Sequence, residues 1–275
     1  MDRARWPMSY AAGMADVLLV DRADGVATLT LNRPESMNSL STELKEALLT
    51  ALSDVGSDRT VRAVVLTGSG RGFCVGQDLA EHVQLLEADD PAPLSTVEEH
   101  YNPIALALAE SAKPVIAAVN GMAAGAGASF AFACDLRVVS EQARFLLAFA
   151  NVGLSLDSGA SWTLPRLIGA GRATELCLLA QPITAQQAAE YGLVTQLVAP
   201  EQVLPVAQEL AARLAAGPTT AYAAIKRALH FSAGHSLRES LANEAMEQHI
   251  AGSTADHRAA TFAFVKKERP VFTGE

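Results

Sequence analysis

The sequence of 275 residues is poor in cysteine, in aromatic side chains and in positive charge. Its three cysteines, Cys74, Cys134 and Cys177, are irregularly spaced, which excludes a disulfide framework and a cysteine metal cluster; we therefore expect no metal site. A formal net charge of -9 argues against nucleic acid or an anionic membrane surface as the main partner. Free thiols are typical of a reducing compartment, so we expect a cytoplasmic protein.

Long apolar runs are also missing, and none is free enough of turn residues to span a bilayer. The first residues lack the apolar stretch of a signal peptide, and we expect residues 1–15 to be a flexible extension. Hydrophobic residues are plentiful, at 50% of the chain, which is enough for a sizeable core. We expect a core domain over residues 16–199 and a helical region over residues 200–275.

Strand, turn and helix signals alternate through the first half of the chain. Two strands over residues 17–31 meet at Asp24-Gly25, which is a hairpin signal. Ser41 is a suitable N-cap for the helix that follows it. Helical patterns then dominate from residue 160 onward, with segments at 160–168, 172–179, 184–191, 200–216, 219–233, 237–250 and 255–267. This order predicts an α/β core followed by a packing or assembly module.

Two apolar strands, residues 63–67 and 114–119, each lead into a glycine-rich turn. A strand that delivers such a turn to a helix leaves several N–H groups without partners. These groups can hold a phosphate or a developing oxyanion. Gly125-Ala126-Gly127 lacks both the Lys-Ser/Thr ending and the three-glycine spacing of phosphate loops. Close packing of helix on strand would explain one such turn alone, but two turns can place a donor on either side of one carbonyl oxygen.

Residues 81–99 form a polar segment that contains Pro91 and Pro93. Prolines and polar residues between periodic segments favour a loop. We expect a mobile loop there, close to the site formed by the glycine turns.

Five motifs in order resemble the crotonase superfamily, also called the enoyl-CoA hydratase/isomerase family: NRPxxxN (32–38), GRGFCVGQDL (70–79), AVNGMAAGAGASFAFACDLRV (118–138), residues 153–166, and FVKKERPVFTG (264–274). The resemblance covers residues 16–275. It implies a spiral of ββα units with a helical C-terminal trimerisation region, assembled as a homotrimer or as a hexamer of two trimers. It also implies that the core binds an acyl-CoA thioester, with no cofactor beyond the CoA of the substrate.

The resemblance assigns roles by motif position. The backbone N–H groups of Gln77 and Ala126 would hold the thioester oxygen. The CoA cleft would be lined by Ser36, Met37, Ser39, Val75, Gln77, Asp78, Leu79, Ala80 and Gly125. Polarising the carbonyl makes the neighbouring C–H acidic and stabilises the enolate that forms.

The reaction depends on the acidic groups that remain. The two glutamates of the family's hydratases fall at Ser129 and Phe149, and neither residue can act as a carboxylate base. Asp157 is the one carboxyl in the matching turn of the site. Such a residue often serves only as a cap or turn former, but an apolar setting would raise its pKa toward a useful range. One base fits proton transfer between two carbons, so the sequence favours an acyl-CoA isomerase with Asp157 as acid and base.

Segments 73–79, 101–103, 123–128 and 153–166 resemble more closely the ring-1,2-epoxyphenylacetyl-CoA isomerase branch of the family, which acts in phenylacetate catabolism. Ser155, Leu156 and Ala160 depart from its pattern and leave the acyl group, aromatic or straight-chain, open. The related dehalogenases place a histidine base where this chain has Asn102, which argues against hydrolytic dehalogenation.

Several other interpretations remain alongside the isomerase. An enoyl-CoA hydratase with non-standard residues, or a non-catalytic acyl-CoA-binding paralogue, would also lack the two glutamates. Cys74 is a conceivable nucleophile, but no motif suggests a histidine partner, and a small loop residue beside the oxyanion hole is the favoured interpretation. His82 and His100 could contact CoA phosphates or simply be solvated.

Overall fold

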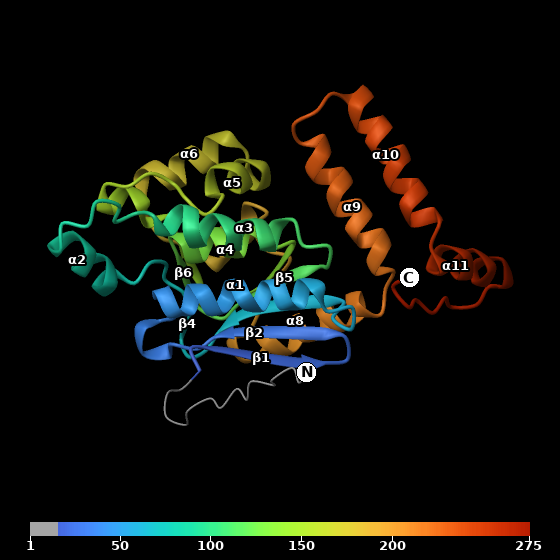
Figure 1. Cartoon of the computed structure of the whole chain (residues 1–275), viewed down its shortest axis with the longest axis horizontal. Coiled ribbons are helices and arrows are strands. Elements are labelled where there is room, and N and C mark those ends of the chain that lie inside the picture. Colours follow the sequence, from blue (N-terminus) through green and yellow to red (C-terminus); the bar gives the residue numbers. More distant parts are fainter. Residues whose placement is uncertain (1–15) are drawn as a thin grey trace, which may run out of the picture.

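The computed structural model describes residues 16–275, and the expected flexible extension, residues 1–15, lies outside this range. Two sheets form the centre of the molecule (Figure 1). The larger sheet has the order β1-β2-β3-β5-β7-β10 and consists of β1 (Leu18–Ala23), β2 (Val26–Leu31), β3 (Ala63–Gly68), β5 (Val115–Val119), β7 (Leu136–Ser140) and β10 (Gln196–Val198). The smaller has the order β4-β6-β8-β9 and consists of β4 (Gly72–Cys74), β6 (Met122–Ala124), β8 (Arg144–Leu146) and β9 (Ile183–Thr184).

The local signals at the start of the chain act as expected. β1 and β2 pair antiparallel around Asp24 and Gly25, which both have positive φ, as a tight two-residue hairpin turn requires. The helix α1 (Thr42–Ser57) begins after Ser41, whose hydroxyl accepts a hydrogen bond from the Leu44 N–H at 3.3 Å. From β2 onward the large sheet is parallel, and its strands are joined by helical crossovers.

Helices cover both faces of the large sheet. On β3, Val64 and Leu66 point to one core cluster, while Ala63 and Val65 point to the other. The first cluster packs under α1, α3 (Asn102–Ala109) and α4 (Ala126–Ala133). The helices α5 (Ala160–Ile168), α6 (Ala170–Leu179) and α7 (Ala185–Glu190) also contribute buried residues to this cluster.

Helix α8 (Val203–Ala215) covers the opposite face of the sheet. Its buried residues Val203, Ala207 and Leu210 belong to the second core cluster, together with strand residues such as Ile116 and Val138. We expected the helical region to begin at residue 200, which would group α8 with the helices that follow. In the structure α8 is instead part of the sheet core, because its apolar face is buried there.

The helices α9 (Thr219–Ser232), α10 (Leu237–Gly252) and α11 (Ala255–Lys266) form an arm that projects from the core (Figure 1). The arm is joined to the core by an ion pair of 2.7 Å between Lys226 Nζ and the Asp135 carboxylate. Arg62, just before β3, donates to Thr219 Oγ1 at 2.9 Å and to the backbone carbonyl of Phe272 at 3.1 Å. These contacts fix the base of the arm and leave most of its length outside the core.

The prediction of a loop over residues 81–99 is wrong for just over half of that segment. Residues Leu79–Glu87 form helix α2, and residues Val97–Tyr101 form a π-helical turn before α3. Asp78 starts α2, because its carboxylate accepts hydrogen bonds from the N–H groups of residues 80 and 81 at 3.1 and 3.5 Å. The prolines at 91 and 93 lie beyond the end of α2 and therefore do not prevent it.

Candidate active site

The two glycine turns leave the same edge of the small sheet. Strands β4 and β6 pair parallel, with Gly72 opposite Met122 and Cys74 opposite Ala123. Because both strands run in the same direction, the segments that follow them emerge side by side. Residues 75–77 and residues 125–126 are therefore neighbours, although they are far apart in the sequence.

Both expected donors have an N–H group without an acceptor among the described residues. Leu40 N–H donates to the Gly76 carbonyl at 2.8 Å and Asp78 N–H to the Leu40 carbonyl at 3.3 Å, so this bridge uses the groups on either side of Gln77 N–H. Ala126 is the first residue of α4 and has no carbonyl one turn before it in the helix. The helix start adds a favourable dipole for negative charge.

Two glycines allow the turns to approach this closely. Gly76 has φ of +85°, and a Cβ placed on it would lie 3.0 Å from the Ala124 carbonyl oxygen and 3.4 Å from the Ala126 nitrogen. A Cβ on Gly127 would collide with the backbone carbonyl group of Cys74. Larger residues at these positions would force the two N–H groups apart.

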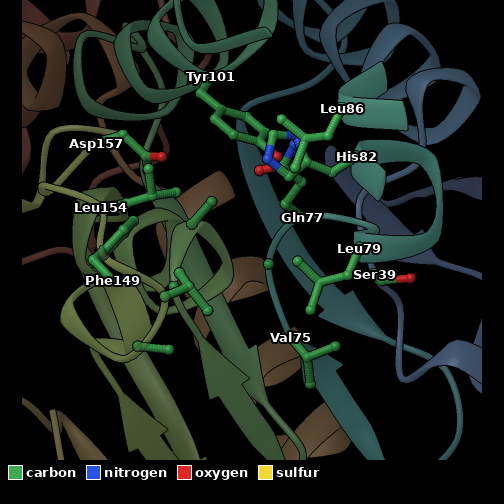
Figure 2. Close-up of a pocket in the computed structure, with 15 residues that line it drawn as sticks. Ser39, Val75, Gln77, Leu79, His82, Leu86, Tyr101, Phe149, Leu154 and Asp157 are labelled. Atoms are coloured by element: carbon green, nitrogen blue, oxygen red, sulfur yellow. The ribbon is translucent and has the colours of Figure 1, made fainter. Parts of the chain in front are cut away.

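A cavity of about 620 Å³ opens at this edge. It is lined by Ser39, Val75, Gly76, Gln77, Leu79, His82, Leu86, Tyr101, Gly125, Ala126, Ala148, Phe149, Val152, Leu154 and Asp157 (Figure 2). Seven of the residues named from the sequence are among them. The cavity therefore brings both backbone donors and the expected carboxyl into one space.

Asp157 lies in the turn between the 3₁₀ helix Ala148–Val152 and α5. In Figure 2 it lines the cavity beside Leu154 and across from the Gln77 segment. Burial raises the pKa of its carboxyl, while a hydrogen bond of 2.7 Å from Ser158 Oγ opposes that rise. A partly buried carboxyl with a raised pKa can accept a proton and also return it.

The two positions of the hydratase glutamates carry no acid–base group. Ser129 is fully buried, and its hydroxyl donates to the Gly125 carbonyl at 3.0 Å within the first turn of α4. Phe149 lines the cavity with an apolar ring. The geometry thus leaves Asp157 as the one carboxyl among the lining residues of this cavity.

Four of the residues expected at the CoA cleft, Ser36, Met37, Asp78 and Ala80, do not line this cavity. The Asp78 carboxylate is held by Arg33 at 2.8 Å and by the Ser39 hydroxyl at 3.0 Å, besides capping α2. Burial alone would raise the pKa of Asp78, but these hydrogen bonds outweigh burial and lower it. Its side chain serves to fix the Gln77 segment to the turn after β2.

Eight lining residues are not among the site residues predicted from the sequence: Gly76, His82, Leu86, Tyr101, Ala148, Phe149, Val152 and Leu154. Tyr101 appeared in the sequence only as part of a Tyr-Asn-Pro match, and nothing local showed that it reaches the cavity. His82, which we considered for CoA phosphate or for solvent, lies on α2 and lines the cavity. His100 does not line the cavity, and its Nδ1 lies 3.2 Å from Thr96 Oγ1.

Cys74 is not an activated nucleophile. It lies at the end of β4, is fully buried, and burial raises the pKa of its thiol to about 12. A thiol of this kind stays protonated at neutral pH and therefore cannot attack as a thiolate. All three cysteines are free.

Within residues 16–275, His, Cys, Asp and Glu side chains form no group of three that could hold a metal ion. In the same part of the chain no helix has both the length and the apolar character needed to cross a membrane.

Two N–H groups without an acceptor among the described residues and a partly buried carboxyl line one cavity, and such an arrangement can polarise a carbonyl and move a proton next to it. The comparisons agree with this class: the enoyl-CoA hydratase/isomerase family model matches residues 21–275. The chain belongs to the enoyl-CoA hydratase/isomerase family and has the crotonase fold, as the motifs indicated.

Among the relatives that match nearly the whole chain, some are named isomerases and others hydratases. The chain is 42% identical over 264 residues to the 1,2-epoxyphenylacetyl-CoA isomerase of Escherichia coli, covering 95% of this chain and 100% of that protein. It is also 42% identical over 253 residues to a "probable enoyl-CoA hydratase" of Rhodobacter capsulatus, covering 92% and 96%. A crystal structure described as an enoyl-CoA hydratase/isomerase from Mycobacterium abscessus superposes with a TM-score of 0.90 at 44% identity, covering 94% and 100%.

Proposed function

We propose that this protein is an acyl-CoA isomerase that moves a double bond, or rearranges a CoA-bound acyl group, through an enolate. The observation that carries the proposal is the single carboxyl, Asp157, which shares a cavity with two N–H groups that have no acceptor among the described residues. An intramolecular proton transfer needs one group that takes a proton and returns it. Addition of water needs a further group to orient and activate that water.

In the proposed mechanism the thioester oxygen accepts hydrogen bonds from Gln77 N–H and Ala126 N–H. The Asp157 carboxylate takes a proton from a carbon of the acyl group, and the electron pair of that C–H bond moves into the enolate. The protonated Asp157 then returns the proton at another carbon, the enolate collapses to the thioester, and the double bond has shifted. Atoms and charge balance with no group besides the CoA thioester, so we propose no further cofactor.

The expected sizes of the two contributions are large. Loss of one oxyanion donor typically costs about 100- to 1,000-fold in rate. A positioned acid–base group contributes about 100- to 10,000-fold. The raised pKa of Asp157 suits both steps, because the carboxylate becomes a stronger base and the neutral acid is still able to give the proton up near neutral pH.

Two alternative functions remain to be compared with the isomerase. A hydratase is supported by the name of the R. capsulatus relative, but Ser129 and Phe149 supply no group that could activate water. A non-catalytic acyl-CoA-binding protein is disfavoured by the retained donors and carboxyl.

The proposed substrate is inferred from the similarity to named relatives and from the positions of the segments near the cavity. The name of the E. coli relative supports a ring-derived acyl group and a role in phenylacetate catabolism. For CoA we propose contacts from the segment 36–39, from residues 75–80 and from Gly125. The free cysteines and the net charge of -9 support a cytoplasmic enzyme without nucleic acid or membrane partners.

We also propose that the arm α9–α11 is an assembly surface that forms a homotrimer or a hexamer. The arm exposes large apolar side chains, among them Leu229 at 65%, Leu237 at 75% and Phe264 at 84% exposed. Apolar patches of this kind mark interfaces between proteins. Light scattering on the intact chain should give three or six times the mass of the chain, and a monomer's mass would contradict the proposal.

The decisive experiment compares the wild type with Asp157→Asn on 3-enoyl-CoA and crotonyl-CoA. The wild type should shift the double bond of the 3-enoyl-CoA without a change of mass. The variant should bind the CoA ester within about threefold of the wild type but lose at least about 100-fold in kcat, because only the proton shuttle is removed. A fully active variant would overturn the role of Asp157, and gain of water by crotonyl-CoA would favour the hydratase.

A further inference from the structure

Two polar atoms in the cavity wall remain without use after the proposed reaction is assigned. Tyr101 and His82 line the cavity, and their atoms Tyr101 Oη and His82 Nδ1 are both buried and have no hydrogen-bond partner among the described residues. Tyr101 is only 1% exposed, so its hydroxyl cannot be satisfied at the outer surface. Native proteins rarely leave such groups unpaired, and at a binding site the missing partner is often the ligand.

The ring of Tyr101 is held firmly, although its hydroxyl is not. The ring packs edge-on against Phe130, with centroids 6.1 Å apart and planes at 74°. Lys45 Nζ lies 5.6 Å from the centroid and is itself fixed by a hydrogen bond of 2.7 Å to Thr96 Oγ1. The position of the hydroxyl is therefore set by the fold before any ligand arrives.

The Tyr101 hydroxyl keeps its proton and can therefore donate a hydrogen bond. Burial and the nearby Asp157 carboxyl raise the pKa of the Tyr101 phenol, which keeps it protonated. His82 approaches from α2, a helix with no buried residue, and Figure 2 draws it with Tyr101 among the residues that line the cavity. A neutral imidazole can donate or accept at Nδ1 according to its tautomer.

Most of the other side chains that line the cavity are apolar, including Leu79, Leu86, Phe149 and Leu154, and the remaining polar ones are Ser39, Gln77 and Asp157. A purely hydrocarbon acyl group would exclude water from Tyr101 and His82 and would offer them nothing in return. An unpaired buried hydroxyl is costly, whereas a matching acceptor removes the cost. Tyr101 and His82 should therefore favour acyl groups that carry an oxygen atom over acyl groups that are hydrocarbon alone.

We propose that Tyr101 and His82 form a polar subsite that hydrogen-bonds an oxygen atom carried by the acyl group away from the thioester. This assigns the substrate class of the proposed isomerase as oxygenated acyl-CoA thioesters, and it rests on the proposed function for the location of the thioester. Tyr101 is the specificity-determining donor, and His82 is the second group on the same oxygen. Neither residue takes part in the proton transfer by Asp157.

The test measures binding rather than turnover. Phenylacetyl-CoA and its 2-, 3- and 4-hydroxy derivatives serve as inert probes in titration calorimetry with the intact chain. The wild type should bind at least one hydroxylated probe about tenfold more tightly than phenylacetyl-CoA, and Tyr101→Phe should abolish that preference while binding phenylacetyl-CoA at least as tightly as the wild type. His82→Leu should reduce the preference for the same isomer.

Tyr191→Phe is the matched control, because it removes the same hydroxyl from a residue outside the cavity, whose ring packs against Arg172. It should leave all four affinities unchanged. Tyr101→Phe should melt at no lower temperature than the wild type, since it breaks no hydrogen bond among the described residues. The proposal is overturned if the wild type prefers phenylacetyl-CoA to all three hydroxylated probes, or if Tyr101→Phe weakens all four equally. Since the probes do not react, an active Asp157→Asn variant would defeat the proposed function and leave this result standing.

Discussion

The two sides of the cavity are built in different ways. The side that would hold the thioester oxygen consists of backbone N–H groups at the edge of a buried sheet, where the chain passes Gly76 and Gly127. The groups that would act on the acyl part are side chains, namely Asp157, which lies across the cavity from the Gln77 segment, and Tyr101 and His82, the latter on the exposed helix α2.

This difference separates what the fold supplies from what single residues supply. Backbone donors depend on how closely two turns approach, so they tolerate many side chains but no extra atom between the turns. A side chain can still act after a small movement of the backbone, but a substitution that removes its functional group abolishes its role. The proposed reaction type therefore depends on the side chains of the cavity. The proposed polarisation of a thioester depends on the backbone N–H groups.

The largest effect on this comparison should come from Gly127→Ala. The added Cβ would lie 2.7 Å from both the carbonyl carbon and the Cβ of Cys74, so α4 must move away from β4. We expect a loss of about 1–3 kcal/mol in the free energy of unfolding. We also expect a loss of about 100-fold or more in kcat/KM, because the Ala126 donor moves with the helix. Thermal denaturation and isomerase kinetics measure the two effects.

Two variants serve as controls for Gly127→Ala. Gly171→Ala adds the same methyl group to α6, where no atom lies within 4 Å, and should gain up to about 1 kcal/mol of stability. Gln77→Ala removes the side chain at a donor but keeps its N–H, and should change kcat/KM by less than about threefold. A loss of 100-fold in Gln77→Ala would show that the backbone half depends on a side chain after all.

A smaller effect should appear in the pH dependence of stability. The folded-state pKa of Asp157 is raised by burial, so the folded protein favours the neutral acid. Below the unfolded pKa the carboxyl is protonated in both states and carries no penalty. As pH rises from the unfolded pKa to the folded pKa, stability falls by about 1.4 kcal/mol per pH unit, because only the unfolded chain ionises freely. Asp157→Asn should therefore gain stability relative to the wild type as pH is raised from about 3 to about 8, measured by denaturant unfolding.

Ser158→Ala provides the companion measurement for Asp157. It removes the hydrogen bond that favours the ionised carboxylate, so the pKa of Asp157 should rise further and the loss of stability should continue to a higher pH. If the difference in the free energy of unfolding between Asp157→Asn and the wild type stays constant over the whole pH range, then burial does not raise the pKa of Asp157.

Local signals predicted most of the strands and helices and the backbone half of the site. The Asp24-Gly25 turn, the Ser41 cap and the strand at 115–119 followed by Gly125 are all set by residues close in sequence. The joint placement of Gln77, Ala126 and Asp157 in one cavity followed from motif position. The structure brings these three residues together without deciding the reaction.

The remainder could not be predicted because it depends on contacts between distant segments. Helix α2 has no buried residue, and it begins at Asp78, whose partners Arg33 and Ser39 lie some forty residues earlier. Tyr101 is the last residue of the π-helical turn before α3 and lines the cavity, a placement that no local signal indicates. Helix α8 resembles the arm helices in sequence pattern, and only its packing against the large sheet separates it from them.

The parallel pairing of β4 with β6 also has a consequence during protein synthesis. Gln77, Ala126 and Asp157 leave the ribosome in that order, and eighty residues (157 minus 77) separate the first from the last. At about 5–20 residues per second, the interval is on the order of ten seconds. A nascent chain that has released β4 alone would thus carry one of the two proposed oxyanion donors and lack the proposed acid–base group, so we expect no activity on a thioester before α5 begins to emerge.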